Sequence, residues 1–326
     1  MKVEELKSSK GITVAVRVLD KYGTTSPQEF IELVKEYGII VWKKQDITSS
    51  EYVDFQKQIG YHQPAEMWCN DPNHPEIFRV TNKKINKYGD EGLFSHGELD
   101  WHCNLGFTPD SEEMISLRAL ACPKGSITSW TNSMPYWRDL SAETREQYKN
   151  YYIHLTNEID LTYEKKLLHY MLPVAEQSDF DKQRKSRSIQ NALNFDQDPA
   201  LYPEPRFTKD NYLRLHPNHP LGMKGIYFPH LNMADIGTVN GEPLPNHQQV
   251  YESIRKKYID DDKYHYNHEW EIGDIIFADQ FTGVHRRNNV WEEQGIDSDS
   301  AEGLRYLERT AFWYKTQFRN HTERCL

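Results

Sequence analysis

The sequence predicts a mainly β protein built around a double-stranded β-helix, or jelly roll, with helices packed outside it. Apolar, strand-like segments occur near both ends of the chain, at residues 11–16, 39–42, 275–277 and 304–314. No internal repeat, low-complexity tract or linker interrupts the 326 residues. We therefore expect one domain over residues 1–326.

Helices are expected where capping residues precede apolar positions at helical spacing. Ser26 caps a first helix, which Gly38 ends. Thr48 and Glu51 have the spacing of a capping box for a second helix. Two further helices are predicted, at residues 141–149 and near residues 250–258.

Two long stretches are irregular. Residues 63–98 mix Pro, Asn and Gly with single apolar residues, and residues 175–212 are polar and rich in Asp, Gln, Arg and Pro. Strand-like segments resume after each stretch, so we interpret both as loop insertions of the single domain. A lid over a binding site is their expected role.

The composition indicates a globular protein and argues against two classes of partner. Aromatic residues are abundant, with 20 Tyr, 13 Phe and 8 Trp, and the formal net charge is -10. That acidic balance disfavours nucleic acid and anionic membranes as main partners. No apolar run approaches the roughly 18–20 residues of a spanning helix. A small molecule is the expected partner, and the oligomeric state is not predicted.

The cysteines favour a reducing compartment. Cys69, Cys103, Cys122 and Cys325 are scattered and form no Cys-x-x-Cys pair. Neither a disulfide framework nor a zinc site is therefore indicated. The first residues also lack the apolar segment of a signal peptide, so a cytoplasmic location is the expectation.

Two distant histidines are candidate metal ligands. Residues i and i+2 of a strand point to one face, so His102 and Asn104 are expected to face inward together. Trp101 and Cys103 are expected on the other side. His285 is the candidate third ligand, from a remote strand. A lone histidine is more often a surface or core residue, but two histidines and a carboxylate together leave three positions on Fe(II) for a 2-oxo acid and O₂.

Arg305 and Arg309 strengthen that site prediction. They alternate with Leu307 on a strand-like segment, so period two puts both guanidinium groups on one face. Two like charges facing inward are costly unless anions meet them, and the guanidinium fork suits a carboxylate. The competing interpretation is a solvated edge strand, or pairing with Glu302 or Glu308. Glu308 belongs to the opposite face and is a poor partner.

These segments resemble the taurine/2-oxoglutarate dioxygenase superfamily, which includes clavaminate synthase and many amino-acid hydroxylases. The resemblance runs over nearly the whole chain. Its motifs are GIIVW at residues 38–42, WHCN at 101–104, GSITSW at 125–130 and GDIIFADQ at 273–280, followed by the distal histidine. It implies Fe(II) held by His102 and His285, with 2-oxoglutarate and O₂ as co-substrates.

The resemblance also implies roles for three further residues. Thr128 occupies the place of a threonine that hydrogen-bonds 2-oxoglutarate, and Arg305 that of the arginine gripping its far carboxylate. Arg309 matches an arginine that often meets an acidic group of the substrate. The stretch between His285 and Arg305 is longer than is usual, and its acidic, polar residues fit a surface insertion.

The conspicuous departure from the family is Asn104, which stands where the second ligand is usually Asp. An amide oxygen is neutral and a weaker iron ligand than a carboxylate. In one interpretation Asn104 still binds iron, directly or through water, either natively or as an engineered replacement of Asp. In another, a small anion fills the position, as in related halogenases; in a third, the metal has been lost. Asp100, two residues before His102, is a remote candidate for the missing carboxylate.

We therefore expect an Fe(II)- and 2-oxoglutarate-dependent oxygenase that oxidises an unactivated C–H bond by hydroxylation, cyclisation or desaturation. Its expected substrate is a small anionic metabolite, derived from an amino acid. A 2-oxoglutarate-dependent halogenase and a non-catalytic jelly-roll binding protein are the alternatives. Besides Arg309, candidate substrate contacts are His62, Asn82 and His230, each of which has the alternative role of a hydrogen-bonded loop residue.

Overall fold

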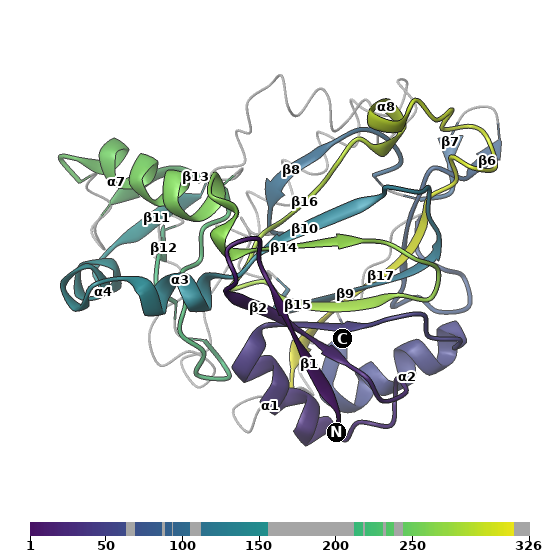
Figure 1. The fold of residues 1–326 in the computed structure, drawn as a ribbon, viewed down its shortest axis with the longest axis horizontal. Coiled ribbons are helices and arrows are strands. Elements are labelled where there is room, and N and C mark those ends of the chain that lie inside the picture. The colour runs from purple at the N-terminus through teal and green to yellow at the C-terminus, as the bar shows by residue number, and fades with distance from the viewer. Residues whose placement is uncertain are drawn as a thin grey trace.

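The computed structural model describes residues 1–62, 69–86, 89–92, 94–104, 112–155, 212–217, 219–230, 233–237 and 244–315. Two β-sheets share a buried interior, and two helices cover the outer face of the larger sheet (Figure 1). A smaller group of helices and short strands lies to one side. The predicted class, mainly β with peripheral helices, is confirmed.

The larger sheet has eight strands. Seven lie in the order β1-β2-β3-β15-β9-β17-β4, and β5 also pairs with β17. Neighbours are antiparallel except β2 and β3, which are parallel. The strands are β1 (Val3–Lys7), β2 (Thr13–Val18), β3 (Ile39–Trp42), β4 (Gly60–His62), β5 (Phe78–Thr81), β9 (Met114–Ala121), β15 (Ile275–Asp279) and β17 (Tyr306–Tyr314).

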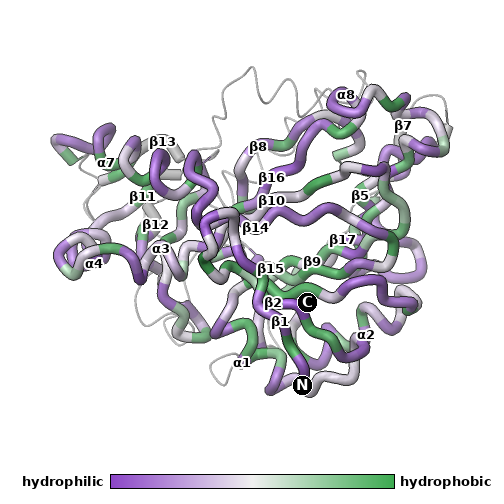
Figure 2. Tube along the Cα trace, viewed as in Figure 1, coloured by the Kyte–Doolittle hydropathy of each residue, from purple (hydrophilic) through white to green (hydrophobic). Residues whose placement is uncertain are grey.

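Alternation along these strands gives the sheet two apolar faces. On β15, Ile275 and Phe277 pack toward the helices, whereas Ile276 and Ala278 pack into the space between the sheets. A strand buried on both faces carries an unbroken apolar run. Figure 2 shows this run on β15, in contrast to the hydrophilic β16 of the other sheet.

Helices α1 (Pro27–Tyr37) and α2 (Ser49–Ile59) begin and end where the capping residues predict. Ser26 and Thr48 are the N-caps, and each forms a capping box with the glutamate three residues later. Gly38 ends α1 with a φ of 71°, a left-handed conformation that glycine adopts without strain. The chain then turns directly into β3, beneath the helix.

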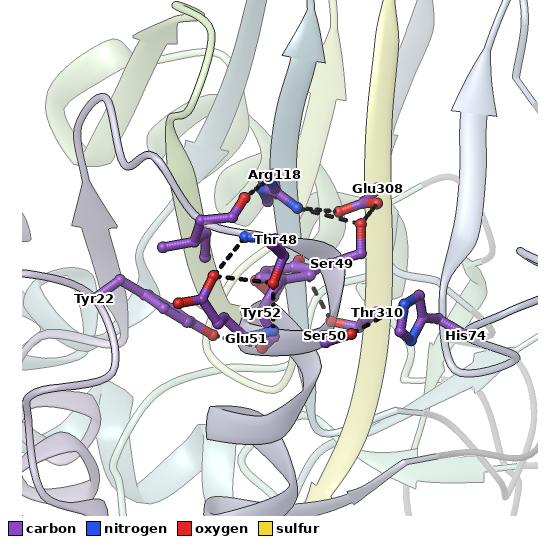
Figure 3. Close-up of polar contacts among 12 residues, drawn as sticks. Tyr22, Thr48, Ser49, Ser50, Glu51, Tyr52, His74, Arg118, Glu308 and Thr310 are labelled. Atoms are coloured by element: carbon purple, nitrogen blue, oxygen red, sulfur yellow. Dashed lines mark hydrogen bonds and ion pairs between the residues drawn. The ribbon is translucent and has the colours of Figure 1, made fainter.

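Polar contacts fasten the start of α2 to the outer face of the sheet (Figure 3). Arg118 on β9 forms an ion pair with Glu308 on β17, with 2.8 Å between Nη1 and Oε2. Ser49 donates a hydrogen bond to Glu308, and Arg118 donates one to the carbonyl of Ile47. Glu308 therefore faces away from the interior, as alternation predicts, and its charge is matched there.

The smaller sheet has the strand order β14-β10-β16-β8 and is antiparallel throughout. Its strands are β8 (Leu99–His102), β10 (Ile127–Thr131), β14 (His265–Glu269) and β16 (His285–Arg287). Trp130 on β10 and Trp270, which follows β14, belong to one buried cluster with Leu307 of the larger sheet. Inward-facing residues of both sheets therefore meet in one core.

The third group of elements packs beside the smaller sheet. Its three-stranded sheet has the order β12-β11-β13, with strands β11 (Tyr152–Leu155), β12 (Tyr212–Arg214) and β13 (Met233–Gly237). Its helices are α3 (Ser133–Asp139), α4 (Ala142–Lys149), α7 (His247–Ile254), η2 (Arg255–Ile259) and η3 (Asp262–Tyr264). Trp101 and Cys103 pack into this group's core. They therefore face away from the space between the two large sheets, as predicted.

The described elements confirm most of the predicted ones and correct others. The predicted helices and the strands at 39–42, 275–277 and 304–314 are present, but β1 and α3 were not predicted. The loop predicted at 63–98 contains β5, β6 (Lys84–Asn86) and β7 (Gly89–Asp90), because β5 extends the sheet beside β17. Helix α8 (Val290–Gln294) begins the polar insertion.

The predicted lid and the search for a membrane-spanning helix both depend on which residues the structure describes. The lid predicted at residues 175–212 lies outside the described residues, except for Tyr212 at its end. Within the described ranges, no helix combines the length and the apolar character needed to cross a membrane.

Candidate active site

The two candidate histidines are direct neighbours on adjacent strands. His102 at the end of β8 pairs with His285 at the start of β16, and their ring centroids are 4.3 Å apart. The Nδ1 of His102 lies 2.6 Å from the carbonyl oxygen of Asp100. Because a carbonyl only accepts, Nδ1 carries the proton and Nε2 keeps its lone pair for a metal.

Burial holds both imidazoles in the neutral form that binds metal ions. It lowers the pKa of His102 to about 4 and that of His285 well below its usual range. The positive charge of Arg309 acts in the same direction on both pKa values. Two neutral imidazoles side by side are suited to share one cation.

Asn104 lies in a turn after β8, so the predicted strand is shorter than expected. Its backbone N–H donates to Oε1 of Gln280 at 2.9 Å. Side-chain alternation therefore does not fix its direction; the hydrogen bond to Gln280 holds its backbone instead. Among the residues that the structure describes, no three His, Cys, Asp or Glu side chains are grouped to hold a metal. Asp100 is therefore not grouped with two other such side chains in the described part of the chain.

Arg305 and Arg309 both belong to the inner face of the larger sheet, with Leu307 between them. Arg305 is only 3% exposed, and its Nε donates to the hydroxyl of Ser126 at 3.2 Å. Its two terminal nitrogens have no hydrogen-bond partner in the described part of the chain. Burial lowers the pKa of Arg305 to about 10. A buried guanidinium without a counterion is a strong indication of an anion site.

Arg309, in contrast, has a counterion that sequence analysis missed. Its Nη2 forms a close ion pair with Oε2 of Glu112, which is 2% exposed. Its guanidinium also lies over the ring of Phe78, 5.1 Å from the centroid. The only sequence signal for this partner is Glu112-Glu113, two acidic residues directly before the apolar strand β9.

Strand β10 runs between the imidazole pair at one end of the site and the guanidinium of Arg305 at the other. Ser126, directly before the strand, and Thr128 and Trp130 within it alternate along one side. They therefore lie in a row that spans roughly 13 Å at about 3.3 Å per residue. Ser126 touches Arg305, and Trp130 pairs with His285, whose ring is 6.3 Å away. Thr128 lies between these ends and accepts a hydrogen bond from Nε1 of Trp270 at 2.8 Å. The row therefore leads from the imidazole pair to the free guanidinium.

Asn82 supports Arg305, and its amide N–H groups are already used within the protein. Its Oδ1 accepts the backbone N–H of Arg305 at 2.8 Å, and its Nδ2 donates to the carbonyls of Ser298 and Gly303. The expected substrate contact is therefore corrected: Asn82 positions the backbone at the anion site.

The other two candidates do not join the site. His62 pairs with Phe312 across β4 and β17 and contacts Gln56 of α2, so it lies on the outer, helix-covered face. His230 stacks against the rings of Phe228 and Tyr251, which also contact each other, in the third group of elements. Its Nδ1 lies 2.7 Å from the tyrosine hydroxyl. Both are accounted for by local packing.

The comparison with known families agrees with this geometry. A family model described as taurine catabolism dioxygenase TauD, TfdA family, matches residues 4–310. The chain belongs to this family. It is therefore an Fe(II)- and 2-oxoglutarate-dependent dioxygenase, and the resemblance found in its sequence is confirmed.

Solved structures of other proteins share the fold of this TauD-family chain. A taurine dioxygenase from Burkholderia xenovorans is 15% identical, with a TM-score of 0.60, over 96% of this chain and 89% of that one. AAD-2, solved with Mn(II) and N-oxalylglycine, is also 15% identical, with a TM-score of 0.61, over 97% and 99% of the two chains. No curated protein sequence matches the chain.

TauD-family dioxygenases use Fe(II), 2-oxoglutarate and O₂. The pair His102 and His285 fits a divalent metal, and the free nitrogens of Arg305 fit a carboxylate. The third ligand position fits less well, because Asn104 brings an amide in place of a negative charge. The residues present therefore fit the co-substrate and a metal whose ligand set is neutral.

Proposed function

We propose that this TauD-family protein is a jelly-roll oxygenase that oxidises an unactivated C–H bond of a small anionic, amino-acid-derived substrate. One arrangement supports the proposal above all others. The imidazoles of His102 and His285 lie at one end of the row Ser126, Thr128 and Trp130, and Arg305 lies at the other, without a counterion among the described residues. A dicarboxylate that chelates a metal with its 2-oxo acid end needs a cation at that far end.

Fe(II) bound here with 2-oxoglutarate supplies the power to oxidise carbon at the expense of O₂, with succinate and CO₂ as by-products. The histidines present neutral nitrogens to the metal. Arg305 would bind the far carboxylate of 2-oxoglutarate, because its single side-chain contact in the described structure uses Nε alone. The backbone N–H of Arg305 donates to Oδ1 of Asn82, and this bond keeps the guanidinium in place.

Thr128 adds a donor to the same carboxylate. Its hydroxyl oxygen already accepts the indole N–H of Trp270, so its own proton remains available for donation. Trp130 and Trp270 line the same core and keep the co-substrate away from water.

Asn104 makes the protein part of the metal site neutral. We propose that its amide oxygen completes the ligand set, since the hydrogen bond from its backbone N–H to Gln280 holds this turn close to the strand that leads to His285. The weaker ligand leaves the metal more electropositive than an aspartate would.

Succinate release tests the proposed function. The protein is incubated with Fe(II), 2-oxoglutarate, O₂ and a panel of amino acids, sulfonates and phosphonates. The proposal expects succinate to form, and it expects His102→Gln and His285→Gln each to abolish that formation. His247→Gln is the matched control, because this histidine lies on α7 outside the site. Succinate formation that survives both ligand substitutions would contradict the proposal.

A further inference from the structure

We infer that Asp279, with its partners His219 and Tyr314, is a positioning residue for the metal end of the site. The three side chains fix the connection at residues 280–284, which joins β15 to β16 and carries the proposed third ligand. The inference rests on the proposed function and adds to it a buried group of residues outside the ligand set.

The carboxylate of Asp279 accepts five hydrogen bonds from the described residues. Its Oδ1 accepts the backbone N–H groups of Phe281 and Thr282 at 3.0 and 2.8 Å, and the hydroxyl of Thr282 at 2.8 Å. Its Oδ2 accepts from Nε2 of His219 at 2.8 Å and from the hydroxyl of Tyr314 at 2.7 Å. One oxygen therefore shapes the connection, and the other ties it to two remote parts of the chain.

The group is buried, and its hydrogen bonds define its protonation states. The side chains of His219 and Asp279 are 1% and 0% exposed. Nδ1 of His219 accepts the backbone N–H of Leu221 at 3.0 Å, so the ring proton is on Nε2 and points at Asp279. Burial acts to raise the pKa of Asp279, but the contacts with His219, Tyr314 and Thr282 outweigh it and lower that pKa. Asp279 is thus an ionised carboxylate whose geometry is fixed by its donors.

The connection holds the segment that contains the proposed third ligand. The backbone N–H of Asn104 donates to Oε1 of Gln280 at 2.9 Å. Sγ of Cys103 lies 3.5 Å from the carbonyl oxygens of Gln280 and Gly283. Strand β8 ends at residue 102, so strand pairing does not place Asn104. Its backbone position therefore depends on the connection.

The second histidine ligand is less dependent on this connection. Val284, directly before His285, donates its N–H to Oγ1 of Thr131 at 3.1 Å and accepts the N–H of Thr131 at 2.9 Å. His285 is therefore also held by β10, as its pairing with that strand shows. We expect the Asp279 group to act mainly through Asn104.

Mn(II) affinity tests the inference without any turnover. Tyr314→Phe removes one bond to Asp279 and keeps the aromatic ring. We expect it to weaken Mn(II) binding at least about fivefold in calorimetric titration, since outer partners of metal ligands are typically worth about 10–100-fold. In an Asn104→Ala background the same substitution should weaken binding less than about twofold, because the residue through which it acts is gone.

Tyr52→Phe is the matched control. It also removes a buried hydroxyl, which donates to Ser116 at 2.8 Å beneath α2, outside the site (Figure 3). Its Mn(II) affinity should equal that of the wild type. The visible absorption of the Co(II)-loaded protein, which reports ligand geometry, should change in Tyr314→Phe and stay unchanged in Tyr52→Phe.

The outcomes separate the inference from the proposed function. Equal losses from Tyr314→Phe in both backgrounds would show a general structural effect and overturn the inference. It is also overturned if Asn104→Ala weakens Mn(II) binding and Tyr314→Phe does not. If the wild type does not bind Mn(II), or Asn104→Ala binds it equally well, the proposed ligand set is wrong and the inference fails with it.

His219 gives a second pair of variants if Tyr314→Phe does not fold. His219→Leu removes the donor to Asp279, whereas the amide of His219→Gln can still donate. We expect His219→Leu to bind Mn(II) at least about threefold more weakly than His219→Gln. Equal affinities of these two variants would overturn the inference.

Discussion

Arg305 is the residue on which the chemical argument depends most. It is buried, and its single side-chain partner in the described structure is the neutral hydroxyl of Ser126. A buried cation without a counterion destabilises a folded protein. A carboxylate of a bound ligand would neutralise this guanidinium. The ligand-free protein should therefore gain stability when the charge of Arg305 is removed.

Arg305→Met should make the ligand-free protein more stable. Methionine fills similar space without a charge, and we expect the free energy of unfolding to rise by about 1 kcal/mol or more. Urea unfolding of the metal-free protein measures this change. Arg138→Met, on the exposed side of α3, is the control and should change stability by less than about 0.5 kcal/mol. A large loss of stability in Arg305→Met would show that Arg305 is a structural residue.

Asn104 is the third metal ligand that we propose. Asn104→Asp should bind Mn(II) at least about tenfold more tightly, because a carboxylate adds charge and a stronger oxygen ligand. Isothermal titration calorimetry with Mn(II) measures the affinity without any turnover. Asn150→Asp, at the end of α4, is the control and should leave it unchanged. An unchanged affinity in Asn104→Asp would show that residue 104 is not a ligand.

His62 provides a pH-dependent test of its placement outside the site. Burial lowers its pKa to about 4, below the usual value of about 6.5 for an unfolded chain. Between these pH values the unfolded chain binds a proton that the native protein does not, so stability falls as the pH falls through this window. His62→Gln should reduce that fall by up to about 1.4 kcal/mol per pH unit.

Urea unfolding at pH 6.5 and pH 4.5 measures this effect. The Mn(II) and 2-oxoglutarate affinities of His62→Gln should equal those of the wild type, since His62 lies on the helix-covered face. Reduced 2-oxoglutarate affinity in His62→Gln would show that this residue contributes to the site.

At the scale of elements, the strands of the larger sheet separate structure from function by their two faces. Arg305, directly before β17, and Leu307 and Arg309 on this strand face the interior, whereas Glu308 faces α2 and pairs with Arg118. The outer pair attaches a helix, and the inner arginines belong to the proposed site. A change on one face should therefore leave the other intact.

Glu308→Ala tests this separation. It leaves Arg118 buried without a counterion, and we expect a loss of about 3–5 kcal/mol in the free energy of unfolding. The double variant Arg118→Leu with Glu308→Leu should lose less, because no charge is left unpaired. Urea unfolding of both variants measures the difference. A smaller loss in Glu308→Ala than in the double variant would contradict the account of α2 attachment.

At the scale of the whole molecule, local signals in the sequence were enough for most elements but not for their assembly. Capping residues such as Ser26 and Thr48 located α1 and α2, and period-two alternation placed Arg305 and Arg309 on one face. These features act over a few residues, so a single sequence contains them. Strand β5 was missed because its stability comes from pairing with β17, far along the chain.

In the candidate site too, features carried by local motifs were predicted and features that depend on long-range contacts were not. His102, His285, Thr128 and Arg305 were found because their motifs resemble a known family. The ion pair of Arg309 with Glu112 and the bond of Asn104 to Gln280 were not found, because each joins residues that only the folded chain brings together. Asn82 was assigned to the substrate, yet its hydrogen bonds with Arg305 and Gly303 form only when the insertion after β16 folds back.

The central claim is that one row of residues on β10 connects a metal end to a carboxylate end. Anaerobic titration of the Fe(II)-loaded protein with 2-oxoglutarate, followed by the visible absorption band of the chelate, tests it most directly. We expect a band that saturates in the wild type and that needs at least about 100-fold more 2-oxoglutarate in Arg305→Met, a difference of roughly 2.7 kcal/mol. Absence of the band in the wild type, or equal titration curves for the two proteins, would contradict it.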